Sequence, residues 1–179
     1  MRSPLMSAAV AAAAIALSPL GQASAAAPAD IGHVVCNGGA LSVQYNPGIT
    51  FAKKTLQLSA NGDMGNCTSK SHPKITGGSI QFQASLPAQC PGPIGPGYAK
   101  ATIYWNDGTR TVIDQTTFRG DTQSFSLEGG SIATGAFAGG TARGSGRTTS
   151  NLTELGARCV VGGLTDYGAT IEQFAVGDI

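Results

Sequence analysis

Charged side chains are scarce in this sequence, which holds 11 Lys and Arg and 10 Asp and Glu among 179 residues, for a formal net charge of +1. Nucleic-acid binding requires a basic stripe that neutralises phosphates. The adjacent basic pair Lys53-Lys54 would point to opposite faces of a strand, so it forms no such stripe. The sequence also lacks the pattern of a basic amphipathic helix that would lie on a membrane surface. We therefore expect no nucleic-acid partner, and the balance of charged residues does not point to any other kind of partner.

Residues able to carry catalysis are few. The chain has two histidines: His33 lies close to the start of the predicted mature protein, and His72 precedes Pro73 in a polar stretch. Neither is expected on a rigid element that would hold a general base. The glycine-rich stretch at 129–140 lacks the Gly-Lys-Ser/Thr ending of a phosphate-binding loop. The sequence therefore predicts no catalytic residue, no cofactor and no resident metal.

Long hydrophobic runs are limited to the start of the chain. Arg2 precedes a run from about residue 5 to residue 20 that is almost all Ala, Leu, Ile, Val and Met. This arrangement is typical of a signal peptide, and the small residues Ala23 and Ala25 form a cleavage site. Cleavage after Ala25 would leave a chain that begins at Ala26 and has no membrane anchor. We expect residues 1–25 to be a signal peptide, residues 26–179 to form a single all-β domain, and the protein to be secreted into the extracellular space.

Apolar and polar residues alternate along most of the remaining chain. Ile80, Phe82, Ala84 and Leu86 share one face of the stretch 79–86, and only Ser and Gln occupy the other. Such alternation predicts a half-buried strand. Further strands are expected at 41–45, 56–60, 98–105, 112–118, 125–127, 141–150 and 170–176, and a helical turn at 152–157. Turn residues gather at 46–48, 61–63, 106–108 and 119–121.

Two segments interrupt this pattern. Residues 86–97 hold several prolines, which cannot donate to a strand ladder, so we expect an exposed loop tethered at Cys90. Residues 129–140 are glycine-rich around Phe137, which we expect to fill a bulged corner of the core. With eight or nine short antiparallel strands between its turns, the sequence predicts an all-β fold. Either an antiparallel immunoglobulin-like β-sandwich or a closed β-barrel would satisfy the spacing.

Four cysteines, Cys36, Cys67, Cys90 and Cys159, allow three pairings. The first predicted hairpin carries Cys36 and Cys67 to the same open end, which favours Cys36 with Cys67 and Cys90 with Cys159. A zinc site built from the first two cysteines and the two histidines is the alternative. Cysteines in an oxidising extracellular compartment form disulfides. We therefore predict two disulfides and no zinc.

Aromatic residues are few, which limits the binding surfaces that the chain can build. Tyr98 and Tyr104 would share one strand face about 20 Å apart, with Trp105 nearby, and this arrangement suggests a carbohydrate-binding surface. Aromatic residues favour strands in any case, and the face holds too few of them for a complete stacking platform. Our candidate binding residues are Tyr98, Tyr104, Trp105 and Ile94, the last because it follows the proline-rich stretch.

Several short motifs occur in order along the chain: Cys-Asn-Gly at 36–38, Tyr-Asn-Pro-Gly-Ile-Thr at 45–50, Ile-Tyr-Trp-Asn-Asp-Gly-Thr at 103–109, Gly-Ala-Phe-Ala-Gly at 135–139, and Cys159. In this order they resemble small secreted, two-disulfide β-proteins of high-GC bacteria that have no assigned function. The resemblance implies a secreted β-protein and brings no catalytic residue with it. The motif at 135–139 is also similar to the Gly-x-Phe-x-Gly turn of dirigent and allene oxide cyclase barrels, a likeness of fold alone.

These observations predict a secreted, non-catalytic binding or structural module with an unknown extracellular partner. Two alternatives stay open. A protease inhibitor would use the proline-rich loop after Cys90, with Ile94 or Tyr98 as an anchor residue. A barrel-type carrier or enzyme for small ligands would need an apolar cavity. That cavity would be lined by phenylalanines, namely Phe82, Phe118, Phe125 or Phe137.

Overall fold

The computed structural model describes residues 31–179, so the predicted signal peptide at 1–25 lies outside the described residues. Strands make up most of this part of the chain, because inward apolar and outward polar side chains alternate along it. In chain order the elements are β1 (His33–Cys36), β2 (Gly39–Ile49), β3 (Lys54–Met64), β4 (Cys67–Thr68), β5 (Gly78–Ala88), β6 (Ile94–Trp105), β7 (Arg110–Gly120), β8 (Ser124–Gly135), β9 (Thr141–Thr148), α1 (Leu152–Val160) and β10 (Leu164–Gly177).

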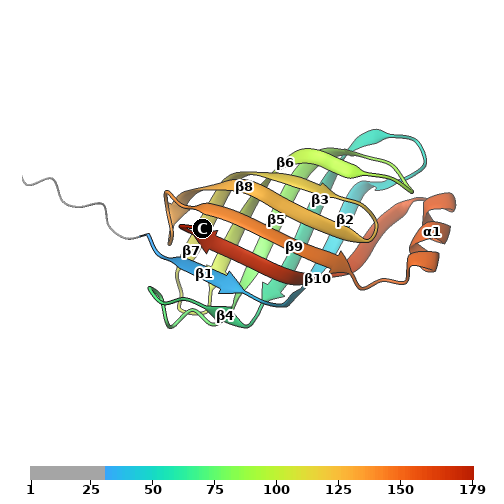
Figure 1. Ribbon diagram of the computed structural model, residues 1–179. Helices are drawn as coiled ribbons and strands as arrows, with labels where there is room; N and C mark the ends of the chain where they lie inside the picture. Colours follow the sequence, from blue (N-terminus) through green and yellow to red (C-terminus); the bar gives the residue numbers. More distant parts are fainter. Residues whose placement is uncertain (1–30) are drawn as a thin grey trace, which may run out of the picture.

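The strands form one antiparallel sheet that closes on itself (Figure 1). Around the ring the order is β2-β3-β5-β6-β7-β8-β9-β10, and β10 pairs with β2 to close it. Beyond the break at residues 37–38, β1 continues the line of β2 and pairs with both β10 and β4. The structure is therefore a closed barrel of eight antiparallel strands, the second of the two predicted architectures, and not a sandwich.

The two ends of the barrel differ. One end, which we call the helix end, carries α1 together with the loop at 89–93 that joins β5 to β6 (Figure 1). At the opposite end, which we call the Phe137 end, β1 begins and β10 finishes, and His33 pairs with Gly177. The turn between β8 and β9, with Phe137 in it, lies at this same end.

Side chains from all eight strands of the ring fill the interior. The predicted inward set on β5 is confirmed, because Ile80, Phe82, Ala84 and Leu86 are all buried. Strand β9 leaves room for two large rings by presenting glycines. A Cβ atom on Gly144 would lie 2.5 Å from the ring of Phe174, and one on Gly146 would lie 2.4 Å from the ring of Phe125.

Both predicted disulfides are present. Cys36–Cys67 joins two directly paired residues of β1 and β4, and Cys90–Cys159 joins the β5–β6 loop to α1. Because the sulfurs of Cys36 and Cys67 are bonded to each other, no thiolate is left for the alternative zinc site. The disulfides therefore tie together segments at both ends of the barrel.

The turn predicted at 61–63 is wrong, because these residues lie inside β3. They pair with β2 on one side and with β5 on the other. A Cβ atom on Gly62 would lie 2.0 Å from the carbonyl oxygen of Ala40, so the close approach of two strands requires a glycine there. The Asn-Gly-Asp composition reflects this packing rather than a change of direction.

The exposed loop predicted at 86–97 is also wrong in its extent. Strand β5 continues to Ala88 and β6 begins at Ile94, so only residues 89–93 connect them. Pro87 and Pro96 lie within register shifts of the sheet, where the ladder of hydrogen bonds is interrupted. The predicted tether is present, since Cys90 is disulfide-bonded and its backbone N–H donates to the carbonyl of Thr50.

The helical turn expected at 152–157 is a nine-residue helix, α1. The side chain of Asn151 accepts a hydrogen bond from the Thr153 N–H and caps its first turn. Leu155 and Cys159 are the buried residues of α1, and Arg158 binds the side chain of Asp166 at the start of β10. Within residues 31–179 no helix combines the length and hydropathy needed to cross a membrane.

Phe137 is buried, as the sequence predicted, but it lies in the β8–β9 turn, and the bulge is earlier, between Leu127 and Gly130. Its backbone φ of 65° is left-handed, which a non-glycine residue adopts only at a cost. The ring centroid lies 4.6 Å from that of His72 and 6.1 Å from that of Trp105. Phe137 therefore closes this end of the barrel.

Candidate functional site

The outer surface of β2, β3, β5 and β6 gathers uncharged hydrogen-bonding side chains, because the polar positions of these strands alternate with the core positions. We call this surface the amide–hydroxyl face. It consists of Ser42, Gln44, Gln57, Ser59, Asn61, Ser79, Gln81, Gln83, Ser85, Tyr98, Thr102 and Tyr104.

The register of the sheet arranges these residues in rows across the strands. Ser42, Asn61, Gln81 and Thr102 form one row. The next row is Gln44, Ser59, Gln83 and Lys100. Because neighbouring strands lie about 4.8 Å apart, each row spans about 14 Å from β2 to β6. Each row therefore presents several donors and acceptors side by side.

Tyr98 and Tyr104 mark the two ends of the face along β6. Their side chains are 68% and 44% exposed, so both rings are available to a ligand. They are six positions apart along the strand, which corresponds to about 20 Å. The face is thus long in the direction of β6 and has one aromatic ring near each end.

The surface is hollowed between the two tyrosines. A shallow depression of about 230 Å³ is lined by Gln81, Gln83, Lys100, Thr102 and Asp114, together with Ala101 and Val112. A second depression, of about 420 Å³, lies beside Tyr98 and shares Lys100 and Asp114 with the first. Together the two depressions make a shallow groove over β6 and the neighbouring part of β7, with Tyr98 in its lining and Tyr104 further along β6.

The groove contains one positive and one negative side chain. The Lys100 Nζ lies 3.8 Å from the Asp114 Oδ1, and both side chains are largely exposed. Such an exposed pair contributes little stability, but the two charges offset each other. Near Tyr104 the surface also carries exposed Arg110 on β7 and exposed Asp63 on β3, one charge of each sign.

The strand pairing of the sheet holds the amide–hydroxyl face in place. Each of β3, β5 and β6 is hydrogen-bonded to a strand on either side, so the backbone that carries the side chains is fixed. Within the face, the Gln57 amide nitrogen donates to the Ser85 hydroxyl at 3.2 Å. A site carried on paired strands is more rigid than one carried on loops.

The structure separates the four predicted binding residues. Tyr98 and Tyr104 lie on the face, whereas Trp105 and Ile94 are 3% and 1% exposed. The Trp105 indole nitrogen donates to the Thr111 hydroxyl inside the barrel at 2.8 Å. Trp105 points inward because it alternates with Tyr104 along the strand, and Ile94 begins β6 as a core residue. Neither belongs to the candidate site.

The amides of the face were missed by sequence reasoning. Ser and Gln at every second position of 79–86 indicated one polar strand face, but no sequence pattern determines the register that places Gln83 beside Ser59 and Lys100. The register shows that the polar sides of four neighbouring strands form one continuous surface.

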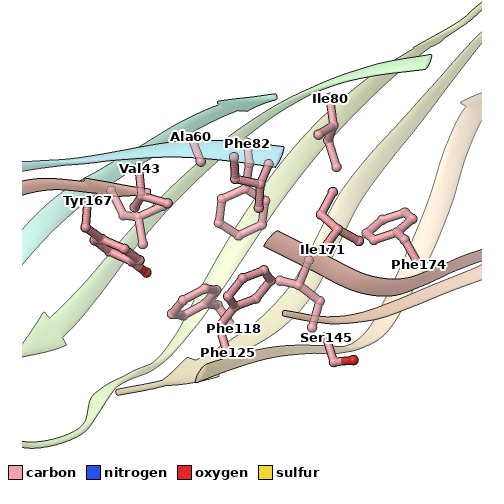
Figure 2. A pocket seen from close by; sticks show the side chains of 13 residues that line it. Val43, Ala60, Ile80, Phe82, Phe118, Phe125, Ser145, Tyr167, Ile171 and Phe174 are labelled. Carbon is pink, nitrogen blue, oxygen red and sulfur yellow. The ribbon is translucent and has the colours of Figure 1, made fainter. Parts of the chain in front are cut away.

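The barrel interior holds a small apolar cavity of about 30 Å³, surrounded by the side chains drawn in Figure 2. Phe82, Phe118 and Phe125 line it as predicted, with their rings turned toward one another, whereas Phe137 does not. The volume accommodates about two water molecules. A lipid or cofactor would have to displace packed aromatic rings to enter.

Two tyrosines are the notable polar residues of the interior. Burial raises the pKa of Tyr45 well above its usual value, and its charge and hydrogen-bond interactions with Tyr167 act in the same direction. Burial also raises the pKa of Tyr167, although the hydrogen bond from Tyr45 opposes this. Both hydroxyls therefore remain protonated at neutral pH.

The histidines do not assemble a catalytic group. His72 Nδ1 lies 3.1 Å from the hydroxyl of the neighbouring Ser71, and its ring rests against Phe137. The nearby Asp107 is held by Thr109, whose hydroxyl and N–H both donate to it and lower its pKa. His33 is exposed on β1. Among residues 31–179 no cluster of three His, Cys, Asp or Glu side chains is arranged to bind a metal.

Comparisons with protein-family models, curated proteins and solved structures find no match for this chain. The resemblance to small secreted bacterial β-proteins therefore stays a prediction. The function has to be argued from the site itself, because the fold alone does not determine it.

Proposed function

We propose that this protein is a secreted, non-catalytic extracellular binding module, and that its ligand binds on the amide–hydroxyl face. The observation that carries the proposal is the combination of ordered neutral hydrogen-bonding groups with two exposed tyrosines on a rigid sheet. Exposed tyrosines with their polar tips are typical of binding surfaces.

The disulfides support the extracellular part of the proposal. Two disulfides are typical of extracellular proteins, because cytosolic reductants keep thiols reduced. Loss of Arg2 with the predicted signal peptide would leave 10 basic and 10 acidic residues, counted from 11 and 10 in the full chain. A neutral, covalently linked barrel suits a module that works outside the cell.

The two alternative functions have less support. An inhibitory loop would need an exposed anchor residue, but Ile94 is buried and Tyr98 lies within strand β6 rather than in a loop. A carrier would need a larger cavity than the one of about 30 Å³ at the centre of the barrel.

Retention on immobilised polymers tests the proposal. The purified, oxidised protein is passed over four matrices: a neutral polysaccharide mixture, alginate, gelatin and vesicles of anionic phospholipid. We expect at least one matrix to retain the wild type and the Phe51→Ala control, which removes an aromatic ring that is 58% exposed outside the face. The double variant Tyr98→Ala/Tyr104→Ala should pass through.

Two results would contradict the proposal. Retention that survives the double tyrosine variant, or no retention by any matrix, would show that this face is not the binding surface. Release of cleaved or chemically altered polymer during the incubation would show that the protein is an enzyme rather than a binding module.

A further inference from the structure

The hydrogen-bonding groups of the amide–hydroxyl face indicate the chemistry of its ligand. Each Gln or Asn amide both donates and accepts, and so does each Ser or Thr hydroxyl. A ligand whose own groups are also both donors and acceptors can pair with any of them. Sugar hydroxyls have this property at nearly every ring position, so a row such as Ser42, Asn61, Gln81 and Thr102 matches a hydroxyl-rich chain.

The charge distribution favours a neutral ligand. Lys100 lies beside Asp114, and near Tyr104 the exposed Arg110 on one side is matched by the exposed Asp63 on the other. Positive and negative side chains are therefore equal in number along the surface, and it offers no cluster of one sign to an acidic or a basic polymer. Electrostatic complementarity is needed to attract a charged partner and to select it over others. The ligand that suits this surface is therefore neutral.

The two tyrosines add apolar contacts at separate points. A Tyr ring presents a flat apolar face with a polar tip, and the C–H face of a pyranose ring can pack against it. Because Tyr98 and Tyr104 are about 20 Å apart, one monosaccharide cannot touch both rings. The spacing requires an extended chain of several sugars lying along β6.

Peptide and protein partners fit this surface less well. An extended peptide binds best at an open strand edge, but β3, β5 and β6 are paired on both sides. A stable protein partner needs a central buried cluster of apolar anchors, whereas amides and hydroxyls separate the two tyrosines here.

We infer that the ligand is a neutral polysaccharide, bound as an extended chain in the groove along β6 between Tyr98 and Tyr104. This inference rests on the proposed function and adds the class of ligand. The rings would pack on sugars at the two ends of the bound segment. Gln81, Gln83 and Thr102 would hydrogen-bond the sugars between them, in the depression of about 230 Å³.

Binding to defined polysaccharides tests the inference. Cellulose, xylan, mannan, amylose and chitin serve as neutral probes, and alginate as the acidic one. We expect at least one neutral probe to retain the oxidised protein, alginate not to retain it, and retention to be equal at low and high salt because no ion pair is involved. Soluble oligosaccharides of the retaining polymer should bind more tightly as their length approaches the distance between the two tyrosines.

Substitutions on the amide–hydroxyl face test whether the polysaccharide binds there. Tyr98→Ala and Tyr104→Ala should each weaken binding at least tenfold, and Gln81→Ala/Gln83→Ala should weaken it similarly. Tyr98→Phe keeps the ring and should retain most of the affinity. Phe51→Ala and Gln123→Ala remove an aromatic ring and an amide that are exposed outside the face, and they should bind as the wild type does. Unchanged thermal melts would show that each variant is folded.

The outcomes separate the inference from the proposed function. If only alginate, gelatin or vesicles retain the protein, and this retention depends on the tyrosines, the ligand is not a neutral polysaccharide. The amide–hydroxyl face would still be the binding surface. If a neutral polymer still retains both tyrosine variants, the inference and the proposed function would both be wrong. No retention by any neutral probe would overturn the inference.

Discussion

The Tyr45 hydroxyl donates to the Tyr167 hydroxyl at 3.3 Å, and this hydrogen bond crosses the seam where β10 closes the barrel against β2. The two rings stack with their centroids 5.8 Å apart. The last strand and the first strand of the ring are thus joined by side chains inside the barrel as well as by backbone hydrogen bonds.

This buried pair makes the barrel sensitive to alkali. Because burial raises the pKa of Tyr45 in the folded protein, the unfolded tyrosine, with its pKa of about 10, loses its proton first. The contribution of this raised pKa to the free energy of unfolding is complete well below the unfolded pKa of about 10, and it is lost as the pH rises through and above that value. We expect the free energy of unfolding, measured by urea denaturation, to fall between about pH 9 and pH 11.

Tyr45→Phe isolates this contribution. At neutral pH it should destabilise the barrel by about 0.5–1.5 kcal/mol, the net value of one hydrogen bond, and it should make the alkaline decline less steep. An unchanged decline in Tyr45→Phe would mean that the sensitivity arises elsewhere.

Phe137→Ala should destabilise the protein by about 3–5 kcal/mol, the usual cost of removing a buried phenylalanine. The ring is 4% exposed and packs against Trp105 and His72 at the Phe137 end. Phe51→Ala, in the β2–β3 loop, is the matched control and should change stability by less than about 0.5 kcal/mol. Equal effects of the two substitutions in urea denaturation would show that Phe137 does not close the barrel.

Two glycines should respond to alanine in opposite ways. In Gly146→Ala the new methyl group would meet the Phe125 ring and the Thr170 carbonyl, so we expect a loss of about 1–3 kcal/mol from overpacking. In Gly156→Ala it would meet nothing within 4 Å, and the higher helix propensity of alanine should stabilise α1 by up to about 1 kcal/mol. The two thermal melting temperatures should therefore move in opposite directions. A stabilised Gly146→Ala would contradict the packing described for β9.

Removing either disulfide should lower the melting temperature. In the chain-entropy treatment, loops closed by links between residues 31 and 69 positions apart correspond to about 3.7 and 4.4 kcal/mol respectively. Cys90→Ser/Cys159→Ser should therefore destabilise at least as much as Cys36→Ser/Cys67→Ser. Peptide mapping without reduction gives the independent check, and free thiols or another pairing would contradict the structure.

The sequence predicted the elements of this fold better than their connections. Alternation identified most of β5 and the part of β6 from Tyr98 to Trp105, and the hairpin between 41–45 and 56–60 placed Cys36 and Cys67 at one end. Residues 61–63 look like a turn because Asn, Gly and Asp favour turns. Gly62 is instead required by the carbonyl of Ala40, a contact between strands that composition does not reveal.

The candidate site was predicted only in part, for a related reason. An exposed Tyr98 and Tyr104 follow from alternation along one strand. The rows of polar side chains between these two tyrosines depend on the relative positions of four strands. These positions are determined by the register of the strands, which turn residues alone do not predict. Ile94 was misjudged because the prolines around it suggested a loop, while the sheet accommodates Pro87 and Pro96 at register shifts.

The seam between β10 and β2 also determines when the barrel can be completed during synthesis. Every other pairing in the ring joins strands that are neighbours along the chain, so a nascent chain can form the meander from β2 to β9 as it emerges. Until residues 164–177 are available, that meander has two unpaired edges, at β2 and at β9, and such edges pair readily with other chains. The last strand therefore converts an aggregation-prone open sheet into a barrel whose ring has no free edge.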